Sequence, residues 1–121
     1  ALVPHLKEAE APNCSPCVIK ALAYIEGHCC EDFSVAELAK ECYVSESRLY
    51  HLFRAEMHKS PVEYKNEMKI LRSIEYLKNE YASVEEISAS LGFRSAAYFR
   101  RLFKKITQMT PTEYRRKHAG V

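Results

Sequence analysis

The feature that most constrains the fold of this chain is an internal duplication, in which one stretch of sequence occurs twice with nearly the same spacing. The first copy covers residues 34–64, SVAELAKECYVSESRLYHLFRAEMHKSPVEY, and the second covers residues 83–114, SVEEISASLGFRSAAYFRRLFKKITQMTPTEY. One inserted residue, Arg94, brings the copies into register, and the matching pairs are then Ser34-Val35 with Ser83-Val84, Leu38 with Ile87, Cys42 with Leu91, Ser45 with Ser95, Leu49 with Phe99, Leu52-Phe53 with Leu102-Phe103, Ser60-Pro61 with Thr110-Pro111 and Glu63-Tyr64 with Glu113-Tyr114. So many matches at one offset indicate a duplicated module, and two copies are too few for a solenoid.

Each copy predicts a short helix followed by a turn. Ser34 and Ser83 stand at N-cap positions, and a glutamate follows three residues later in both copies, which is the pattern of a capping box. Apolar residues then recur with helical spacing as far as the turn, which contains Tyr43 in the first copy and Gly92 in the second. Glycine is suited to such a turn because it adopts positive φ without strain.

A second amphipathic helix follows the turn in each copy, over about residues 46–57 and about residues 95–106. Its expected inner face consists of Leu49, Leu52, Phe53 and Met57 in the first copy, and of Phe99, Leu102, Phe103 and Ile106 in the second. A helix, a tight turn and a capped helix form the helix-turn-helix signature, in which the second helix enters a DNA major groove. The outward residues, which are candidates for DNA contact, are Ser47, Tyr50, His51 and Arg54 in the first copy, and Ala96, Ala97, Tyr98, Arg100, Arg101 and Lys104 in the second.

Helices are also expected outside the two copies. Ser15 is placed as the N-cap and Pro16 as the first residue of a helix, and Pro61 begins a long helix that reaches about Lys78. The expected apolar stripe of this long helix is Tyr64, Met68, Leu71, Ile74 and Leu77. The predicted fold class is therefore all-α, with two helix-turn-helix subdomains joined by a linker helix. Its parts are an N-terminal tail at residues 1–14, a first subdomain at 15–60, the linker helix at 61–79 and a second subdomain at 80–121.

Positive charge is concentrated at the C-terminal end. The net formal charge of the whole chain is +2, but residues 94–121 contain eight Arg and Lys against the single acid Glu113. The rest of the chain is net acidic, so the basic segment carries a charge of about +7 by itself. Such a bias is the electrostatic footprint of a protein that binds a polyanion.

The five cysteines are expected to be reduced thiols, because their number is odd and the chain shows no disulfide framework. Cys14 and Cys17 form a CxxC pair, with His28, Cys29 and Cys30 downstream, and this pattern raises the possibility of a zinc site. If one helix contains both Cys17 and Cys29, however, the two lie roughly 18 Å apart, so the ligands do not converge. No metal and no cofactor are expected.

Other classes of protein are disfavoured by what the sequence lacks. No apolar run has the length of a membrane span and no signal peptide is visible, so we expect a cytoplasmic protein without a membrane partner. Asp32 is the only Asp in the sequence, and nothing places a nucleophile beside a base. The chain is therefore not expected to be an enzyme.

Residues 91–116, LGFRSAAYFRRLFKKITQMTPTEYRR, resemble the most specific stretch of the AraC/XylS family of bacterial transcription regulators. The first motif and the order of two motifs joined by one helix support the resemblance, which covers about residues 17–118. It implies about seven helices in two homeodomain-like subdomains, with recognition helices that enter adjacent major grooves of double-stranded DNA. It also implies RNA polymerase as a partner, and a sensor or dimerisation domain, N-terminal to such a unit, that is missing from this chain.

Carried over position by position, the resemblance implies a set of contact residues in each motif. The residues implied to contact bases are Ser47, Tyr50, His51, Ala96, Ala97, Tyr98, Arg100 and Arg101. The residues implied to contact phosphates are Ser45, Arg54, Ser95, Lys104 and Lys105. The chain departs from the family pattern at Tyr43, where the family often has Gly, and at Lys69 and Ser73, where Arg and Ala are common. Glu46 adds an anion near the start of the first recognition helix.

The leading hypothesis from the sequence is sequence-specific DNA binding by a transcription activator. One alternative is a protein-interaction module that contacts RNA polymerase or a partner domain and binds DNA only weakly. A second alternative is a thiol-based repair or redox function built on Cys14 and Cys17.

Overall fold

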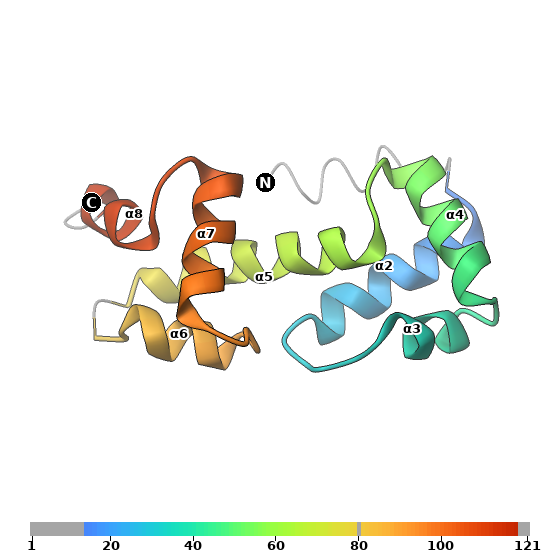
Figure 1. Cartoon of the computed structure of the whole chain (residues 1–121), viewed down its shortest axis with the longest axis horizontal. Coiled ribbons are helices and arrows are strands. Elements are labelled where there is room, and N and C mark those ends of the chain that lie inside the picture. The colour runs from blue at the N-terminus through green and yellow to red at the C-terminus, as the bar shows by residue number, and fades with distance from the viewer. Residues whose placement is uncertain (1–13, 80, 119–121) are drawn as a thin grey trace. The chain divides into compact units, whose positions relative to one another are not determined.

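In a computed structural model, which describes residues 14–79 and 81–118, the described chain consists of helices and connecting turns, without β-strands. The helices are α2 (Pro16–His28), α3 (Val35–Glu41), α4 (Glu46–Met57), α5 (Pro61–Leu77), α6 (Val84–Ser90), α7 (Ala96–Thr107) and α8 (Pro111–His118) (Figure 1). The prediction of an all-α fold with two helix-turn-helix motifs and about seven helices is confirmed. The N-terminal tail expected at 1–14 lies outside the described residues, except for Cys14.

The helices form two compact units. One unit comprises the described residues up to His28 together with Phe33–Tyr64, and the other comprises Cys29–Asp32 together with the described residues from Lys65 onward. The first unit therefore contains α2, α3 and α4, and the second contains α6, α7 and α8. Helix α5 begins in the first unit and continues into the second, so each helix-turn-helix motif has its own packing partners.

The sequence repeat is also a repeat of backbone geometry. Ser34, Ser45, Ser83 and Ser95 are N-caps with extended backbone, and the hydroxyl of each accepts the N–H of the residue three positions later. At Ser83 the full capping box forms, because Glu86 also accepts the Ser83 N–H at 2.9 Å. These local hydrogen bonds fix the starts of α3, α4, α6 and α7, as the sequence predicted.

Positive φ angles occur at equivalent places in the two copies. The turn between the motif helices has φ +59° at Tyr43 and +81° at Gly92, and the C-caps His58 and Gln108 have φ +62° and +68°. The Tyr43 side chain is 84% exposed, so the first copy keeps this turn with a residue other than glycine. The departure at Tyr43 therefore leaves the motif intact.

The repeated PxEY sequence forms the first turn of α5 and of α8. Ser60 and Thr110 cap these helices, and Glu63 and Glu113 accept the backbone N–H of their respective caps at 2.8 Å. Behind the caps, Tyr64 makes an edge contact with Phe53, with ring centroids 5.8 Å apart. In the second copy Tyr114 makes the same contact with Phe103 at 5.7 Å. Both tyrosines are therefore packing residues.

In the first unit, α2, α3 and α4 pack against one another. Their buried residues include Val18, Leu22 and Ile25 of α2, Leu38 of α3, and Leu49 and Phe53 of α4. The backbone N–H of Ser15 donates to Glu56 of α4 at 2.7 Å, which joins the start of α2 to this core. The Ser15 hydroxyl, however, is buried without a hydrogen-bond partner, so Ser15 precedes α2 without capping it through its side chain.

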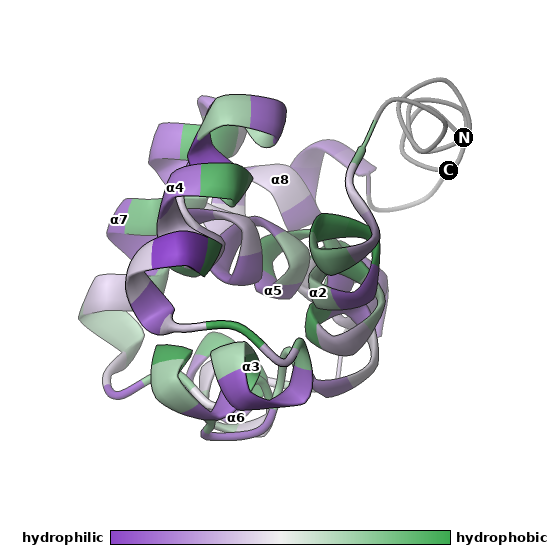
Figure 2. Ribbon diagram, turned by 90° about the vertical axis from the view of Figure 1, so that its right-hand side faces the viewer, coloured by the Kyte–Doolittle hydropathy of each residue, from purple (hydrophilic) through white to green (hydrophobic). Residues whose placement is uncertain are grey.

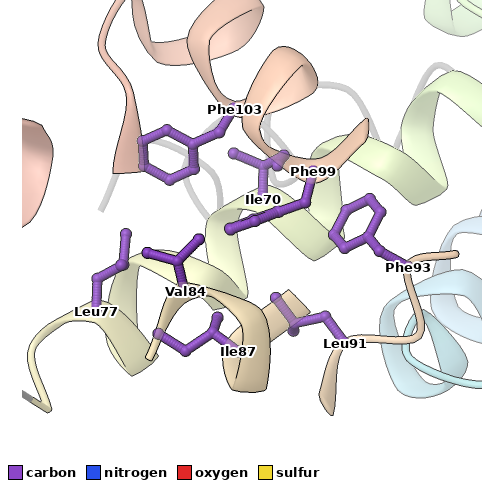
Figure 3. Packing of buried hydrophobic residues seen from close by; sticks show 8 residues of the cluster. All are labelled: Ile70, Leu77, Val84, Ile87, Leu91, Phe93, Phe99 and Phe103. Atoms are coloured by element: carbon purple, nitrogen blue, oxygen red, sulfur yellow. The ribbon is translucent and has the colours of Figure 1, made fainter. Parts of the chain in front are cut away.

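The core of the second unit is a single hydrophobic cluster. Its buried members come from α5, α6, α7 and the turn between the motif helices: Ile70, Leu77, Val84, Ile87, Leu91, Phe93, Phe99 and Phe103. Figure 3 shows these side chains pointing toward one another, with Phe99 and Phe103 of α7 facing α5 and α6. Truncation of a buried Phe of this kind to Ala typically costs about 3–5 kcal/mol.

Two apolar residues expected on inner faces lie outside the core. Leu71 and Ile106 are both 38% exposed, whereas Ile70 is fully buried and Ser73 occupies the buried side of α5. Ser73 can be buried because its hydroxyl bonds the carbonyl of Ile70 within the helix. Polar and apolar residues nevertheless alternate around most helices, as the purple and green segments of α3 and α4 show (Figure 2).

None of the helices in the described part of the chain is long and apolar enough to cross a membrane.

Candidate nucleic-acid interface

The outward face of α4 is the candidate interface of the first unit. Leu49 and Phe53 hold one face of α4 in the core, so the opposite face of the helix points to solvent. The predicted contact residues Ser45, Ser47, Tyr50, His51 and Arg54 are all exposed, with Tyr50 48% exposed. The structure thus gathers these residues on one helix with its capping turn. This face is sparsely charged, since Arg48 and Arg54 are its basic side chains and Glu46 is acidic.

The outward face of α7 is the candidate interface of the second unit. Phe99 and Phe103 are fully buried and fix the rotation of the helix. The predicted contact residues Ser95, Ala97, Tyr98, Arg101, Lys104 and Lys105 are exposed, and Ala96 and Arg100 are partly exposed. The small side chains at the start of α7 leave its first turn open to close approach, and Arg and Lys follow along the same helix.

Tyr98 and Arg101 are braced on this face. The Asn66 side-chain amide of α5 donates to the Tyr98 hydroxyl at 3.3 Å, and the Tyr98 ring lies 6.1 Å from the ring of Phe93. The guanidinium of Arg101 lies over the Tyr98 ring at 5.8 Å from its centroid. An arginine held against an aromatic face loses less freedom when it forms a further contact. Asn66 was not among the predicted site residues, because only the tertiary fold brings α5 beside α7.

Arg100 has an anionic partner within the motif. Its guanidinium forms an ion pair with Glu85 of α6, and the two side chains are 42% and 65% exposed. The hydrogen bond from Arg100 lowers the pKa of the Glu85 carboxyl below its usual value. The Arg100 guanidinium is therefore held by the carboxylate of Glu85, whereas the Arg101 guanidinium lies against the ring of Tyr98.

Two other basic residues are engaged within the protein. Arg115 of α8 donates to three backbone carbonyls, those of Leu77 at 3.1 Å, Asn79 at 3.1 Å and Ala82 at 2.7 Å. In the first unit Arg54 forms an exposed ion pair with Glu63 at 3.3 Å. The count of basic residues in the sequence therefore overstates the positive charge available to a ligand, and Arg115 acts as a structural residue.

Lys69 is a buried cation behind the second motif. Its side chain is 7% exposed in α5, it donates to the Gly92 carbonyl at 3.3 Å, and it lies 4.8 Å from the centre of the Phe93 ring. Burial lowers the pKa of Lys69 from its usual value. Lys69 thus supports the turn of the second motif from behind, a role that the sequence did not reveal.

The thiols form no metal centre in the part of the chain that the structure describes, where no three His, Cys, Asp or Glu side chains converge. Cys17 interacts with Cys42, and burial raises the pKa of Cys42 to about 11 and also raises the pKa of Cys17. Cys29 and Cys30 have sulfur atoms 3.9 Å apart. A thiol whose pKa is raised is mostly protonated at neutral pH and is a poor nucleophile, so the geometry around Cys17 gives no support to a thiol-based activity.

Known proteins contain the same arrangement of two helix-turn-helix motifs. Residues 38–117 match a family model described as a helix-turn-helix domain. The chain is 35% identical over 100 residues to the xylose operon regulatory protein of Haemophilus influenzae, which covers 83% of this chain and 26% of that protein. It is 30% identical over 111 residues to the arabinose operon regulatory protein of Escherichia coli, which covers 91% of this chain and 38% of that protein.

Solved structures of similar fold also superpose on this chain. An AraC-type transcriptional regulator from Chromobacterium violaceum superposes with a TM-score of 0.80 at 26% identity, over 87% of this chain and 94% of that one. The DNA-binding domain of AdpA, solved in complex with a target DNA, superposes with a TM-score of 0.77 at 26% identity, over 86% of this chain and 94% of that one.

The chain belongs to the AraC/XylS family. Its two helix-turn-helix motifs are those of an AraC-type DNA-binding domain, and the family is one of transcription regulators rather than of enzymes. The chain spans about a quarter to two fifths of the length of the two curated AraC/XylS relatives, 26% and 38% respectively.

Proposed function

We propose that this AraC/XylS chain binds double-stranded DNA at specific sequences and thereby regulates transcription, as an activator. In this proposal α4 and α7 are the recognition helices, and they enter adjacent major grooves one helical turn apart. Helix α5 is the connector between the two DNA-reading motifs. The observation that carries the proposal is the face of α7, where open small side chains and exposed Arg and Lys lie opposite the buried Phe99 and Phe103.

The two recognition helices are proposed to use different side chains. On α4 we propose that Ser47, Tyr50 and His51 contact bases, and that Ser45 and Arg54 contact phosphates. On α7 we propose that Ala96, Ala97, Tyr98, Arg100 and Arg101 contact bases, and that Ser95, Lys104 and Lys105 contact phosphates. Arginine can donate two hydrogen bonds to guanine, and a small side chain can approach a thymine methyl group.

Two kinds of similarity support DNA binding and regulation. The AdpA domain that superposes on this chain was solved with its target DNA, and the curated relatives are named as regulators of the xylose and arabinose operons. RNA polymerase and a sensor or dimerisation domain are the proposed protein partners. The resemblance to the family supports the first proposal, and the greater length of the relatives supports the second.

The test is selection of binding sites from a random duplex DNA library, followed by titration of the selected site and of scrambled DNA at two salt concentrations. We expect two short sequence blocks one helical turn apart, bound much more tightly than scrambled DNA. With about six phosphates neutralised, log K should fall against log salt with a slope near −5. No enrichment, together with a flat salt response, would contradict the proposal.

The variant Arg101→Ala distinguishes DNA binding from the alternative that the chain is a protein-interaction module. If DNA binding is the function, this variant loses affinity for the selected site and keeps binding to RNA polymerase or a partner domain. If the variant loses partner binding while its DNA affinity is unchanged, the interaction module becomes the better description.

A further inference from the structure

The ion pair between Glu85 and Arg100 joins the two helices of the second motif, and its place in the duplication is informative. In the register of the two copies, Glu85 corresponds to Ala36 and Arg100 corresponds to Tyr50. The first motif thus folds with the same caps and the same turn geometry without an ion pair at this place. The pair is therefore not needed to form a helix-turn-helix.

The pair itself contributes little to the stability of the fold. Both side chains are substantially exposed, and an exposed ion pair contributes little to stability. Glu85 lies in the first turn of α6, where a carboxylate suits the helix dipole, but it is not the capping residue, because Glu86 forms the capping box with Ser83. The helix dipole accounts for a carboxylate at this place but not for its pairing with Arg100, and a carboxylate on a surface expected to face phosphates opposes non-specific DNA binding.

The chemistry of the pair suggests a role in recognition. A guanidinium has five N–H donors in one plane, and the hydrogen bond to Glu85 uses the Nη2 group while leaving other donors available. Two donors on one edge are sufficient for the O6 and N7 atoms of a guanine. A carboxylate that already occupies Arg100 also reduces its attraction to a phosphate, which presents the same type of acceptor.

We propose that Glu85 is a positioning residue that holds Arg100 for a base contact and withholds it from the phosphate backbone, so that Glu85 raises specificity at the expense of affinity for unrelated DNA. The inference rests on the proposed function, because it needs a specific DNA site. The first motif, with Ala36 and Tyr50, has no counterpart of this device. Discrimination by this route is therefore expected only for the bases read by α7.

The experiment measures the affinity of the selected site, of the same site with each base pair changed, and of scrambled DNA. The variants are Glu85→Gln, which removes the charge at constant shape, and Glu85→Ala, which places there the residue found in the first motif. We expect both variants to bind scrambled DNA about threefold more tightly, with a salt slope steeper by about 0.9 because Arg100 then contacts a phosphate. Discrimination at one base pair of the α7 block should fall at least about threefold.

Controls separate this role from general charge and from folding. Glu75→Gln removes one negative charge and the exposed ion pair between Glu75 of α5 and Lys78, which directly follows α5, and it should leave base discrimination unchanged. In an Arg100→Gln background, Glu85→Gln should have no further effect on discrimination, because the effect passes through Arg100. Thermal unfolding curves should be nearly the same for all variants, since the first motif folds with Ala at the equivalent position.

The outcomes are distinct. If the wild-type protein selects a site and the Glu85 variants keep its discrimination and salt slope, the inference is wrong and the proposed function stands. If Glu85→Gln still lowers discrimination in the Arg100→Gln background, Glu85 does not act through Arg100 and the inference is also wrong. If the wild-type protein selects no site, the proposed function fails and the inference fails with it.

Discussion

At the scale of the residue, the turns of the two motifs show how the same backbone is obtained with different side chains. Gly92 has φ +81°, and a Cβ atom added there would lie 2.7 Å from the carbonyl oxygen of Cys30. Tyr43 has φ +59° at the equivalent position and its side chain points to solvent, where Lys20 lies 4.6 Å from the centre of its ring. The second turn is therefore closed to a side chain by a neighbouring backbone, and the first is open.

This contrast predicts that substitution by Ala destabilises the second turn and is tolerated in the first. Gly92→Ala should destabilise the protein by about 2 kcal/mol or more, because strain at positive φ adds to the contact with Cys30. The matched variant Tyr43→Ala should cost less than about 1 kcal/mol, since it removes an exposed ring and keeps the turn. Urea unfolding followed by circular dichroism measures both. Equal losses would show that the contact at Gly92 is relieved by movement of the 29–32 segment.

At the scale of the element, Arg115 adds a polar attachment of α8 to the rest of the second unit, beside the packing of Tyr114 on Phe103. Arg115→Met removes the donor to the carbonyls of Leu77, Asn79 and Ala82, and we expect a loss of about 1–3 kcal/mol in unfolding free energy. Arg116→Met removes the same charge from an exposed neighbour and should change stability by less than about 0.5 kcal/mol. Chemical denaturation of the two variants side by side tests this. A similar small effect from both would mean that water replaces the guanidinium at these carbonyls.

The helix caps predict an acid-sensitive stability. Backbone N–H groups of the caps lower the pKa values of Glu63, Glu86 and Glu113 below the usual 4.5, so these carboxyls bind protons more weakly in the folded chain than in the unfolded chain. Their contribution is thus fully present above about pH 4.5 and is lost as the pH falls through the lowered folded values.

Melting temperatures measured from pH 6 to pH 3 should therefore fall below about pH 4.5, and the fall should be smaller in Glu86→Gln combined with Glu113→Gln. Gln can still accept the N–H of the cap but does not titrate in this range. An unchanged pH dependence in the double variant would place the acid sensitivity elsewhere.

At the scale of the whole molecule, the two motifs share a fold and differ in chemistry. The outward face of α4 combines aromatic and polar residues with few charges, and that of α7 is basic. If each motif reads its own block of bases, Tyr50→Ala should weaken selection of one block and Arg101→Ala should weaken selection of the other, each by about tenfold at the affected base pair. Library selection with each variant measures this. Loss of both blocks from either change would contradict independent reading.

Much of the candidate site was predictable, because helical periodicity fixes which residues of a recognition helix point outward. All the predicted contact residues of α4 and α7 lie on exposed or partly exposed positions. Leu71 and Ile106 were assigned to the core by the same reasoning, yet each is 38% exposed. Periodicity gives the direction of a side chain but not the extent of the surface that packs against it.

The sequence by itself determined the duplication, the caps of the two repeated motifs, their turns and the order of the helices, since each depends on hydrogen bonds and backbone angles within a few residues. Only the tertiary structure decided which charges are available. It paired Arg100 with Glu85, placed Arg115 on three carbonyls and buried Lys69 behind the turn at Gly92. These partners lie 15 to 38 residues apart in the chain, so they meet only when the helices pack.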